Sequence, residues 1–183
     1  MSYCDAASHP VHGPYHDHEH GVPVRDDAVL LERLTLEIAQ AGLSWLTVLN
    51  KRAHFRAAFD QFDPEKIAAY GDAERERLMA DAGIIRNRRK IDATIENARV
   101  VLRLREAHGG FAAWLDAHHP LPLEEWRRLF KGTFRFTGGE IVNELLVSTG
   151  YLPGAHRESC PAYARVLAMN PPWARVQGVG SRE

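Results

Sequence analysis

Apolar side chains recur along this chain at intervals of three and four residues, the spacing that places them on one face of an α-helix. The clearest run lies between Asp26 and Gly42, with an acidic residue at its start and a glycine at its end, as at helix caps. No segment alternates apolar and polar residues in the manner of a half-buried strand. The pattern therefore predicts an all-α fold.

Further helices begin at residues that suit an N-cap. Ser44 precedes one amphipathic run, and Asp63 followed by Pro64 precedes another, because proline is favoured in the first helical turn. Residues 1–24, rich in histidine, glycine and proline, should form an irregular arm, and residues 166–183 a flexible tail, which leaves one domain over residues 1–165. The predicted helices cover residues 26–42, 45–59, 64–71, 74–80, 87–107, 111–117, 123–130 and 140–148.

The composition fits a protein with one sizeable core. The chain has 183 residues, of which 45% are apolar and 26% charged. It has no apolar run that approaches a membrane span and no N-terminal leader pattern, so we expect a soluble protein of the cytoplasm with no membrane partner. The net charge is −1, so any binding to nucleic acid must come from a local basic surface.

Glu37 departs from the apolar pattern of its helix. It shares one helical face with Leu30, Leu34 and Ala41. An ionised carboxylate is costly to bury unless it is paired, so this glutamate either bonds to a neighbouring backbone group or lines a functional pocket. The pattern alone leaves both interpretations open.

Aromatic residues could complete a pocket with Glu37. Trp45 begins the next predicted helix, Tyr15 lies in the N-terminal arm, and Phe136 is a further candidate. Aromatic rings and one carboxylate suit a flat, cationic ligand such as an alkylated purine, which would stack on the rings and place its exocyclic amine against the acid. The alternative is an ordinary aromatic core cluster.

Cysteine and histidine residues near the two ends of the chain have the spacing of a metal site. His156 and Cys160 are separated by three residues, and Cys4 with His16 would complete a Cys2His2 set, which is typical of structural zinc. A disulfide between the two cysteines is not expected in a reducing cytosol. Adventitious metal binding is the alternative, because the arm contains further histidines at positions 9, 12, 18 and 20.

Basic residues follow a short turn between two predicted helices. Gly83 lies in the turn, and Arg86, Arg88, Arg89 and Lys90 come directly after it. Backbone N–H groups at such a turn suit a phosphate, and cations near a helix N-terminus oppose the helix dipole unless an anion offsets them. The segment predicts a phosphate contact, with a solvated helix start as the alternative.

Short motifs cover most of the chain from Cys4 to about Cys160. The most specific is Gln40-Ala-Gly-Leu-Ser-Trp45, preceded by Glu37. The others are residues 15–19, 21–23, 47–49, 51–52, 62–63, 81–86 and 90–91. Taken together, these motifs resemble the DNA-3-methyladenine glycosylase I family of the helix-hairpin-helix superfamily.

The resemblance implies a helix-hairpin-helix DNA glycosylase fold with a structural zinc site that joins the N- and C-terminal segments. It also implies a monofunctional base-excision repair enzyme that flips 3-methyladenine out of alkylated double-stranded DNA and hydrolyses its glycosidic bond. Because the methylated base is a cation with a weakened bond, recognition can supply most of the catalysis, and the family lacks the superfamily's usual catalytic aspartate. We further expect a bacterial, nucleoid-associated monomer.

Particular residues take on roles through this resemblance. The hairpin of about residues 74–100 matches the segment that contacts the DNA backbone, and Glu37 is the candidate catalytic residue. The implied zinc ligands are Cys4, His16, His156 and Cys160; the base-binding residues are Tyr15, Glu37 and Trp45; and the DNA-binding residues are Gly42, Leu43, Gly83, Arg86, Arg88 and Lys90.

The chain also departs from the family pattern. Ala6 and His20 stand where tryptophan is usual, and Gly139 and Glu140 stand where small hydroxyl residues are common. Two rival functions remain: a glycosylase with shifted alkylpurine specificity, which Ala6 would favour, and a zinc-stapled DNA-binding module without catalysis, against which the presence of Glu37 and Trp45 argues. The other carboxylates that could contribute are Asp92, Glu96, Glu140 and Glu144.

Overall fold

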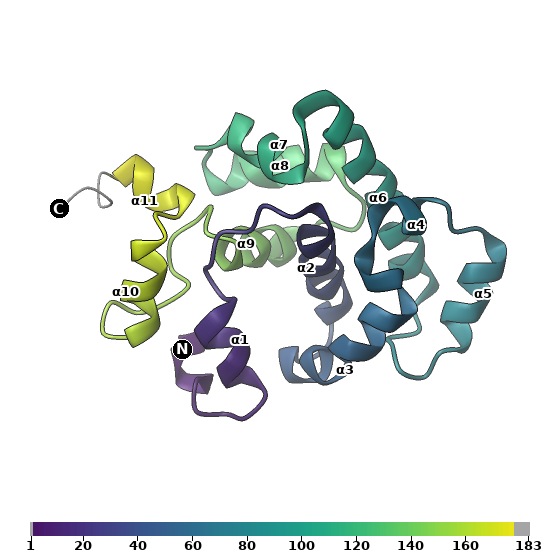
Figure 1. The fold of residues 1–183 in the computed structure, drawn as a ribbon, viewed down its shortest axis with the longest axis horizontal. Helices are drawn as coiled ribbons and strands as arrows, with labels where there is room; N and C mark the ends of the chain where they lie inside the picture. Colours follow the sequence, from purple (N-terminus) through teal and green to yellow (C-terminus); the bar gives the residue numbers. More distant parts are fainter. Residues whose placement is uncertain (1, 178–183) are drawn as a thin grey trace.

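The protein consists of helices joined by short connections (Figure 1). The structure, a computed structural model, describes residues 2–177, and these contain no strand, which confirms the all-α prediction. The short 3-10 helices are η1 (Tyr3–Ala6) and η2 (Asp60–Phe62). The α-helices are α1 (His12–His18), α2 (Asp27–Gln40), α3 (Trp45–Ala58), α4 (Pro64–Ala68), α5 (Asp72–Ala80), α6 (Arg88–His108), α7 (Phe111–His118), α8 (Leu123–Thr133), α9 (Gly139–Ser148), α10 (Pro161–Ala168) and α11 (Pro172–Gln177).

Side-chain caps fix the starts of several helices where the sequence predicts them. The carboxylate of Asp26 accepts a hydrogen bond from the N–H of Val29 at 3.0 Å. Ser44 and Asp63 likewise cap α3 and α4. These bonds satisfy backbone donors that a helix start leaves free, so the boundaries follow from local sequence.

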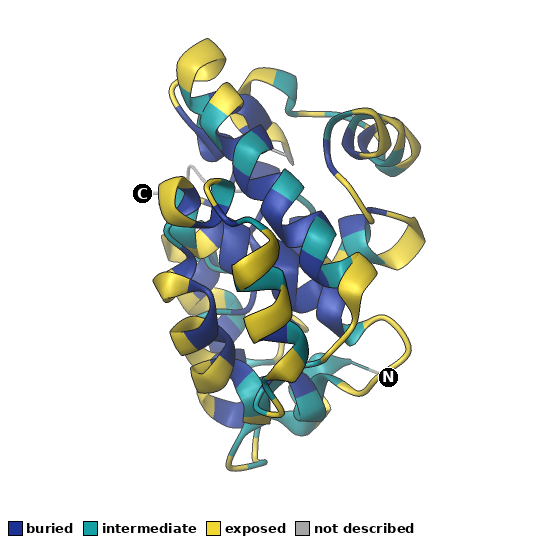
Figure 2. Ribbon diagram, turned by 90° about the vertical axis from the view of Figure 1, so that its right-hand side faces the viewer, coloured by how far each residue is buried: buried dark blue, intermediate teal, exposed yellow. Residues whose placement is uncertain are grey.

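Helix α2 lies at the centre of the molecule and packs against α3, α6 and α9. Every residue from Leu30 to Ala39 is buried, so the helix is covered on all sides and not along one stripe only. Figure 2 shows the same division, with buried residues on the inner helices and exposed ones on the outer turns. Polar residues of α2 therefore lie in the interior. Among residues 2–177, no helix is both long enough and apolar enough to cross a lipid bilayer.

The two ends of the chain are more regular than expected. The arm of residues 1–24 contains η1 and α1, and the segment expected to be a flexible tail contains the end of α10 and all of α11, with Trp173 and Ala174 buried. Pro161 and Pro172 each occupy the first position of a helix, where proline is compatible with helical geometry, so they start helices and do not break them. The rest of the expected tail, residues 178–183, lies outside the described residues.

Candidate functional site

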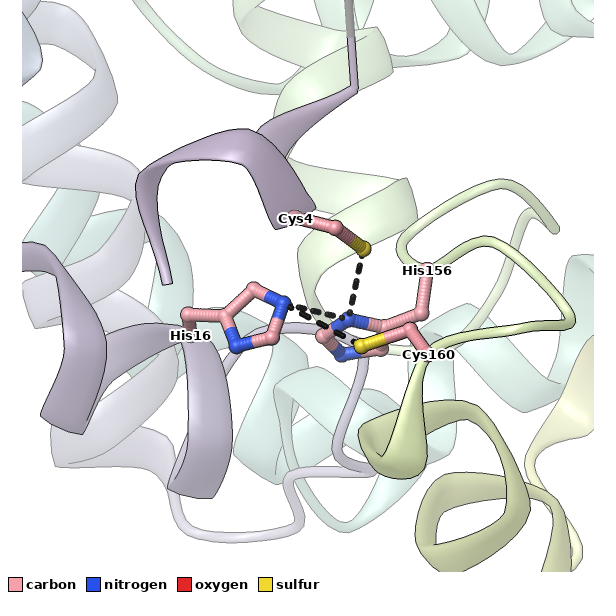
Figure 3. A group of neighbouring side chains, drawn as sticks. All are labelled: Cys4, His16, His156 and Cys160. Atoms are coloured by element: carbon pink, nitrogen blue, oxygen red, sulfur yellow. Dashed lines mark hydrogen bonds between the residues drawn. The ribbon is translucent and has the colours of Figure 1, made fainter. Parts of the chain in front are cut away.

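Four residues from the two ends of the chain converge as the sequence predicts. The side chains of Cys4, His16, His156 and Cys160 point toward a common centre (Figure 3), and their ligand atoms all lie within 4.8 Å of one another. Nε2 of His16 lies 3.2 Å from Nδ1 of His156, and each histidine nitrogen lies 3.7 Å from a cysteine sulfur. Metal bonds of about 2.0–2.3 Å at tetrahedral angles would separate ligand atoms by about 3.3–3.8 Å. The donor set and its spacing therefore fit one tetrahedral metal ion.

The groups around this cluster orient its ligands. Nδ1 of His16 lies 2.8 Å from the carboxylate of Asp17, and Nε2 of His156 lies 2.7 Å from the backbone oxygen of His20. These bonds leave one nitrogen of each ring facing the centre, as in metal sites whose histidines are held by outer partners. Burial raises the pKa of the Cys4 thiol, but hydrogen bonds from Ser2, the two histidines and the backbone outweigh it and lower that pKa to about 5, which favours the metal-binding thiolate.

Beside this cluster lies a cleft of about 530 Å³. It brings together Tyr15 of α1, Glu37 of α2 and Trp45 of α3, as the sequence predicts. The rings of Tyr15 and Trp45 meet edge to face, with centroids 5.3 Å apart. Phe136 does not join them, because it lies in the connection before α9 and lines a different hollow. A cleft of this size that combines aromatic rings with polar groups able to orient a ligand is typical of a small-molecule or nucleobase site.

Glu37 is the buried carboxyl group of the cleft. It is 6% exposed, and within the described residues its side chain has no hydrogen-bond partner. Burial, reinforced by the nearby charge of Glu144, raises its pKa to about 8, although Arg33 acts in the opposite direction. The sequence suggests an ionised group, but in the free protein the carboxyl group is mostly protonated at pH 7. Such an unpartnered acid is available for a ligand.

The other candidate carboxylates differ in position. Glu144 lines the cleft, and burial raises its pKa. Asp92, Glu96 and Glu140 form ion pairs with arginines instead and do not line the cleft. Glu37 and Glu144 are therefore the acids that can meet a bound base.

Arg33 contacts a residue of the cleft wall, Tyr15, without lining the cleft itself. It was not identified from the sequence. It is 1% exposed, and its guanidinium donates to the hydroxyl of Tyr15 at 2.7 Å and to the backbone oxygen of Ser148 at 3.1 Å. Its position four residues before Glu37 places both on one helical face, which is the signal that could have identified it. Arg33 thereby fixes the orientation of Tyr15 in the cleft.

An ion-pair network attaches the N-terminal arm to α2 and α3. Arg52 donates to both carboxylate oxygens of Glu19, at 2.8 and 2.7 Å, and also to Glu32 at 2.7 Å. Arg56 donates to Glu32 at 2.6 Å. The arm is therefore held by the bidentate pair of Arg52 with Glu19 as well as by the metal-ligand cluster, and both anchors flank Tyr15.

The predicted phosphate-binding turn lies between α5 and α6. Arg86 and Arg88 are exposed and form no ion pair within residues 2–177, so both are free to meet an anion. Lys90 is not free, because its ammonium donates to the backbone oxygens of Ala39 and Ala41 at the end of α2. Gly83 lies close to the exposed ring of His54, which would have to move to make room for a Cβ, since a Cβ at Gly83 would lie 2.7 Å from that ring. Lys90 thus has a structural role, whereas Arg86 and Arg88 remain available to a phosphate.

The turn after α2 also lies at the surface. Gly42 has a φ of +83°, in the left-handed region that favours glycine, and Leu43 is 43% exposed. Lys90 joins this turn to the start of α6 through its bond to Ala41. An exposed apolar side chain on a constrained turn is suited to inserting into a partner.

A second basic turn precedes α9. It was not predicted from the sequence. Gly138 is the N-cap of α9 and provides no side-chain cap, and the hydroxyl of Thr137 is buried without a partner in residues 2–177. The hollow beside it is lined by Arg128, Lys131 and Arg135. Although Glu124 also lines the hollow and Glu140 lies in the first turn of α9, a helix start with three cations nearby is a second candidate surface for phosphate.

Known proteins match this sequence and this arrangement of helices. A family model described as methyladenine glycosylase matches residues 5–126. The chain is 54% identical to DNA-3-methyladenine glycosylase 1 of Escherichia coli over 112 residues, which is 60% of each chain. It is 43% identical to DNA-3-methyladenine glycosylase of Haemophilus influenzae over 107 residues, 57% of this chain and 58% of that one. The matched stretch thus spans about three fifths of these relatives' length.

The fold has counterparts among solved structures. The 3-methyladenine DNA glycosylase I of Staphylococcus aureus, whose structure is described as the basis of 3-methyladenine recognition, superposes with a TM-score of 0.78 at 29% identity. The superposition covers 88% of this chain and 95% of that one. Similarity in three dimensions thus extends over more of the molecule than the sequence matches do.

Proposed function

Because this chain belongs to the methyladenine glycosylase family, we propose that it is a DNA glycosylase that releases 3-methyladenine from alkylated double-stranded DNA. The observation that carries the proposal is the buried, unpartnered carboxyl group of Glu37 in a cleft with Tyr15 and Trp45. An adenine presents an exocyclic amine to such a group and a flat face to the rings.

The cleft would act by recognising a base that is already a good leaving group. Once flipped into the cleft, the methylated base would stack against Trp45 and Tyr15, and its amine would donate to Glu37. The positive charge of the lesion would favour the ionised form of Glu37, so binding would displace a proton from the free protein. The interaction strengthens the preference for an alkylated cation over a neutral base.

The metal cluster would have a structural part in this function. We propose that Cys4, His16, His156 and Cys160 hold one Zn²⁺, because two thiolates and two imidazoles form a closed tetrahedral set that leaves no position for a substrate. Such an ion supplies binding energy to folding. The ligands themselves join the N-terminal arm to the C-terminal segment and so keep Tyr15 beside Glu37.

The DNA backbone would be held by basic residues outside the cleft. We propose that the α5–α6 hairpin contacts phosphates through Arg86, Arg88 and the backbone near Gly83, in the manner of a helix-hairpin-helix anchor. Gly42 and Leu43 would face the gap that the flipped nucleotide leaves. The turn before α9 offers a second phosphate surface.

The activity is tested by incubating the purified protein with methylated duplex DNA and identifying the released bases by chromatography. We expect 3-methyladenine to be the main product. Release of another alkylpurine in its place would favour the shifted-specificity alternative, which the presence of Ala6 and His20 in the cleft supports. DNA binding without release of any base would contradict the enzyme and leave the DNA-binding module.

The hairpin is tested by removing charge. Arg86→Ala and Arg88→Ala should each weaken binding to lesion-free and lesion-bearing duplex several-fold and reduce the slope of log K against log salt by about 1, while base selectivity is kept. Arg103→Ala, an exposed arginine further along α6, is the matched control. If all three variants lose the same affinity, only net charge matters and the anchor lies elsewhere, with Arg135→Ala as the next variant to measure.

A further inference from the structure

Tyr3 forms part of the cleft wall, and neither the sequence motifs nor the proposed base-binding set includes it. Its ring meets the ring of His20 at a centroid distance of 4.8 Å and that of Tyr15 at 6.0 Å, both edge to face. It therefore extends the aromatic surface that Tyr15 and Trp45 begin. Figure 1 shows the segment that carries Tyr3 beside α1, next to the N-terminus.

The hydroxyl of Tyr3 is held in place. It lies 2.9 Å from Nδ1 of His12, which also lines the cleft. The two rings are nearly perpendicular, with centroids 5.6 Å apart. A phenol fixed by an imidazole adds a polar edge to the aromatic part of the wall that Tyr15 and Trp45 form.

Helix η1 positions Tyr3 through several local contacts. Ser2 and Asp5 form reciprocal capping bonds at its N-terminus, and Cys4 belongs to the metal-ligand cluster. Ala6 also lines the cleft but contributes only a methyl group. Tyr3 is therefore the residue of η1 that can offer a ring to a bound base.

We propose that Tyr3 is a further base-contacting residue, whose ring closes the side of the cleft that Ala6 leaves open and whose hydroxyl, positioned by His12, meets the polar edge of the alkylpurine. The inference rests on the proposed function and deepens it by naming a selectivity residue. When an aromatic residue that stacks on a base is replaced by alanine, the affinity for that base falls by a factor of about five to more than a hundred. His12 acts through Tyr3 and is a positioning residue.

Calorimetric titration with free 3-methyladenine tests the proposal, using the full-length protein with its metal content measured. Tyr3→Ala should weaken binding about tenfold or more. Tyr3→Phe keeps the ring and should lose only a few-fold, the effect of one hydrogen bond. His12→Ala should weaken binding of the base as much as Tyr3→Phe does. The double variant Tyr3→Phe/His12→Ala should lose no more affinity than either single variant, because both changes remove the same contact.

Tyr163→Ala is the matched control, since Tyr163 packs on Trp173 near Cys160 but does not line the cleft. It should bind the base as the wild type does. Tyr3→Leu replaces Tyr3→Ala if the latter does not fold, because it keeps apolar bulk on η1 without the aromatic face. Unchanged affinity of a folded Tyr3 variant overturns the proposal, and so does tighter binding, which would mean that the ring obstructs the cleft. If the wild type neither binds nor excises 3-methyladenine, the proposed function itself fails.

Discussion

Glu37→Gln is expected to slow the release of 3-methyladenine at least about tenfold while the fold and the metal site persist. A tenfold loss corresponds to about 1.4 kcal/mol of transition-state stabilisation. Glutamine keeps the size of the side chain and one acceptor oxygen, but it cannot carry the negative charge that complements a methylated, cationic base. Single-turnover release from methylated DNA measures the effect, and circular dichroism checks the fold.

The same substitution should change the dependence on pH, because burial raises the pKa of Glu37 to about 8. In the wild type, release should rise as pH increases toward about 8, since the ionised form is the better partner of the cation; in the variant this rise should disappear. The stability of the fold should change with pH in the opposite direction to base release. Between the ordinary pKa of glutamate and about 8, the native state binds more protons than the unfolded state, so Glu37 lowers the free energy of unfolding as pH rises.

Glu37→Gln should therefore stabilise the protein by an amount on the order of 2 kcal/mol at pH 7 and by little at pH 5. Denaturant unfolding at the two pH values measures this difference. Glu140→Gln is the control, because Glu140 is exposed, paired with Arg127 and outside the cleft. Unchanged release by a folded Glu37→Gln protein would give Glu37 a structural role only and make Glu144 the next acid to test.

Cys160→Ala is expected to lose the bound metal and much of the protein's stability. A metal present at a thousandfold its Kd stabilises the native state by about 4 kcal/mol. For a chain of this size, loss of that stabilisation lowers the Tm by roughly 8–16 °C. Unfolding should not be complete, because the ion pair between Arg52 and Glu19 still attaches the arm to α3. Elemental analysis and calorimetry measure the two effects, and about one zinc per chain is expected in the wild type.

Glu158→Ala provides the control for the metal site. Glu158 lies between His156 and Cys160 in sequence but is exposed and outside the ligand set. It should keep both the metal and the Tm of the wild type. Wild-type protein prepared without chelators that contains no zinc, or a Cys160→Ala protein with an unchanged Tm, would contradict the assignment.

Local sequence was sufficient for the helices between residues 26 and 148 and for their caps, but it did not predict α1, α10 and α11. Asp26, Ser44 and Asp63 cap the helices that they precede, because such bonds depend only on neighbouring residues. The cysteines and histidines of the cluster and the acid at position 37 were candidates from their spacing, but the pattern left other roles open, and only the resemblance of the motifs to a known family assigned the roles.

Only the tertiary structure decided which side chains make structural contacts inside the protein and which face the cleft. Lys90 belongs to a basic run but caps the carbonyl end of α2, and Arg33 is buried behind Tyr15. Tyr3 reaches the cleft because η1 is fixed beside α1. These contacts join residues far apart in sequence, whose free energies depend on burial and on partners supplied by other helices, so no local pattern of the chain could specify them.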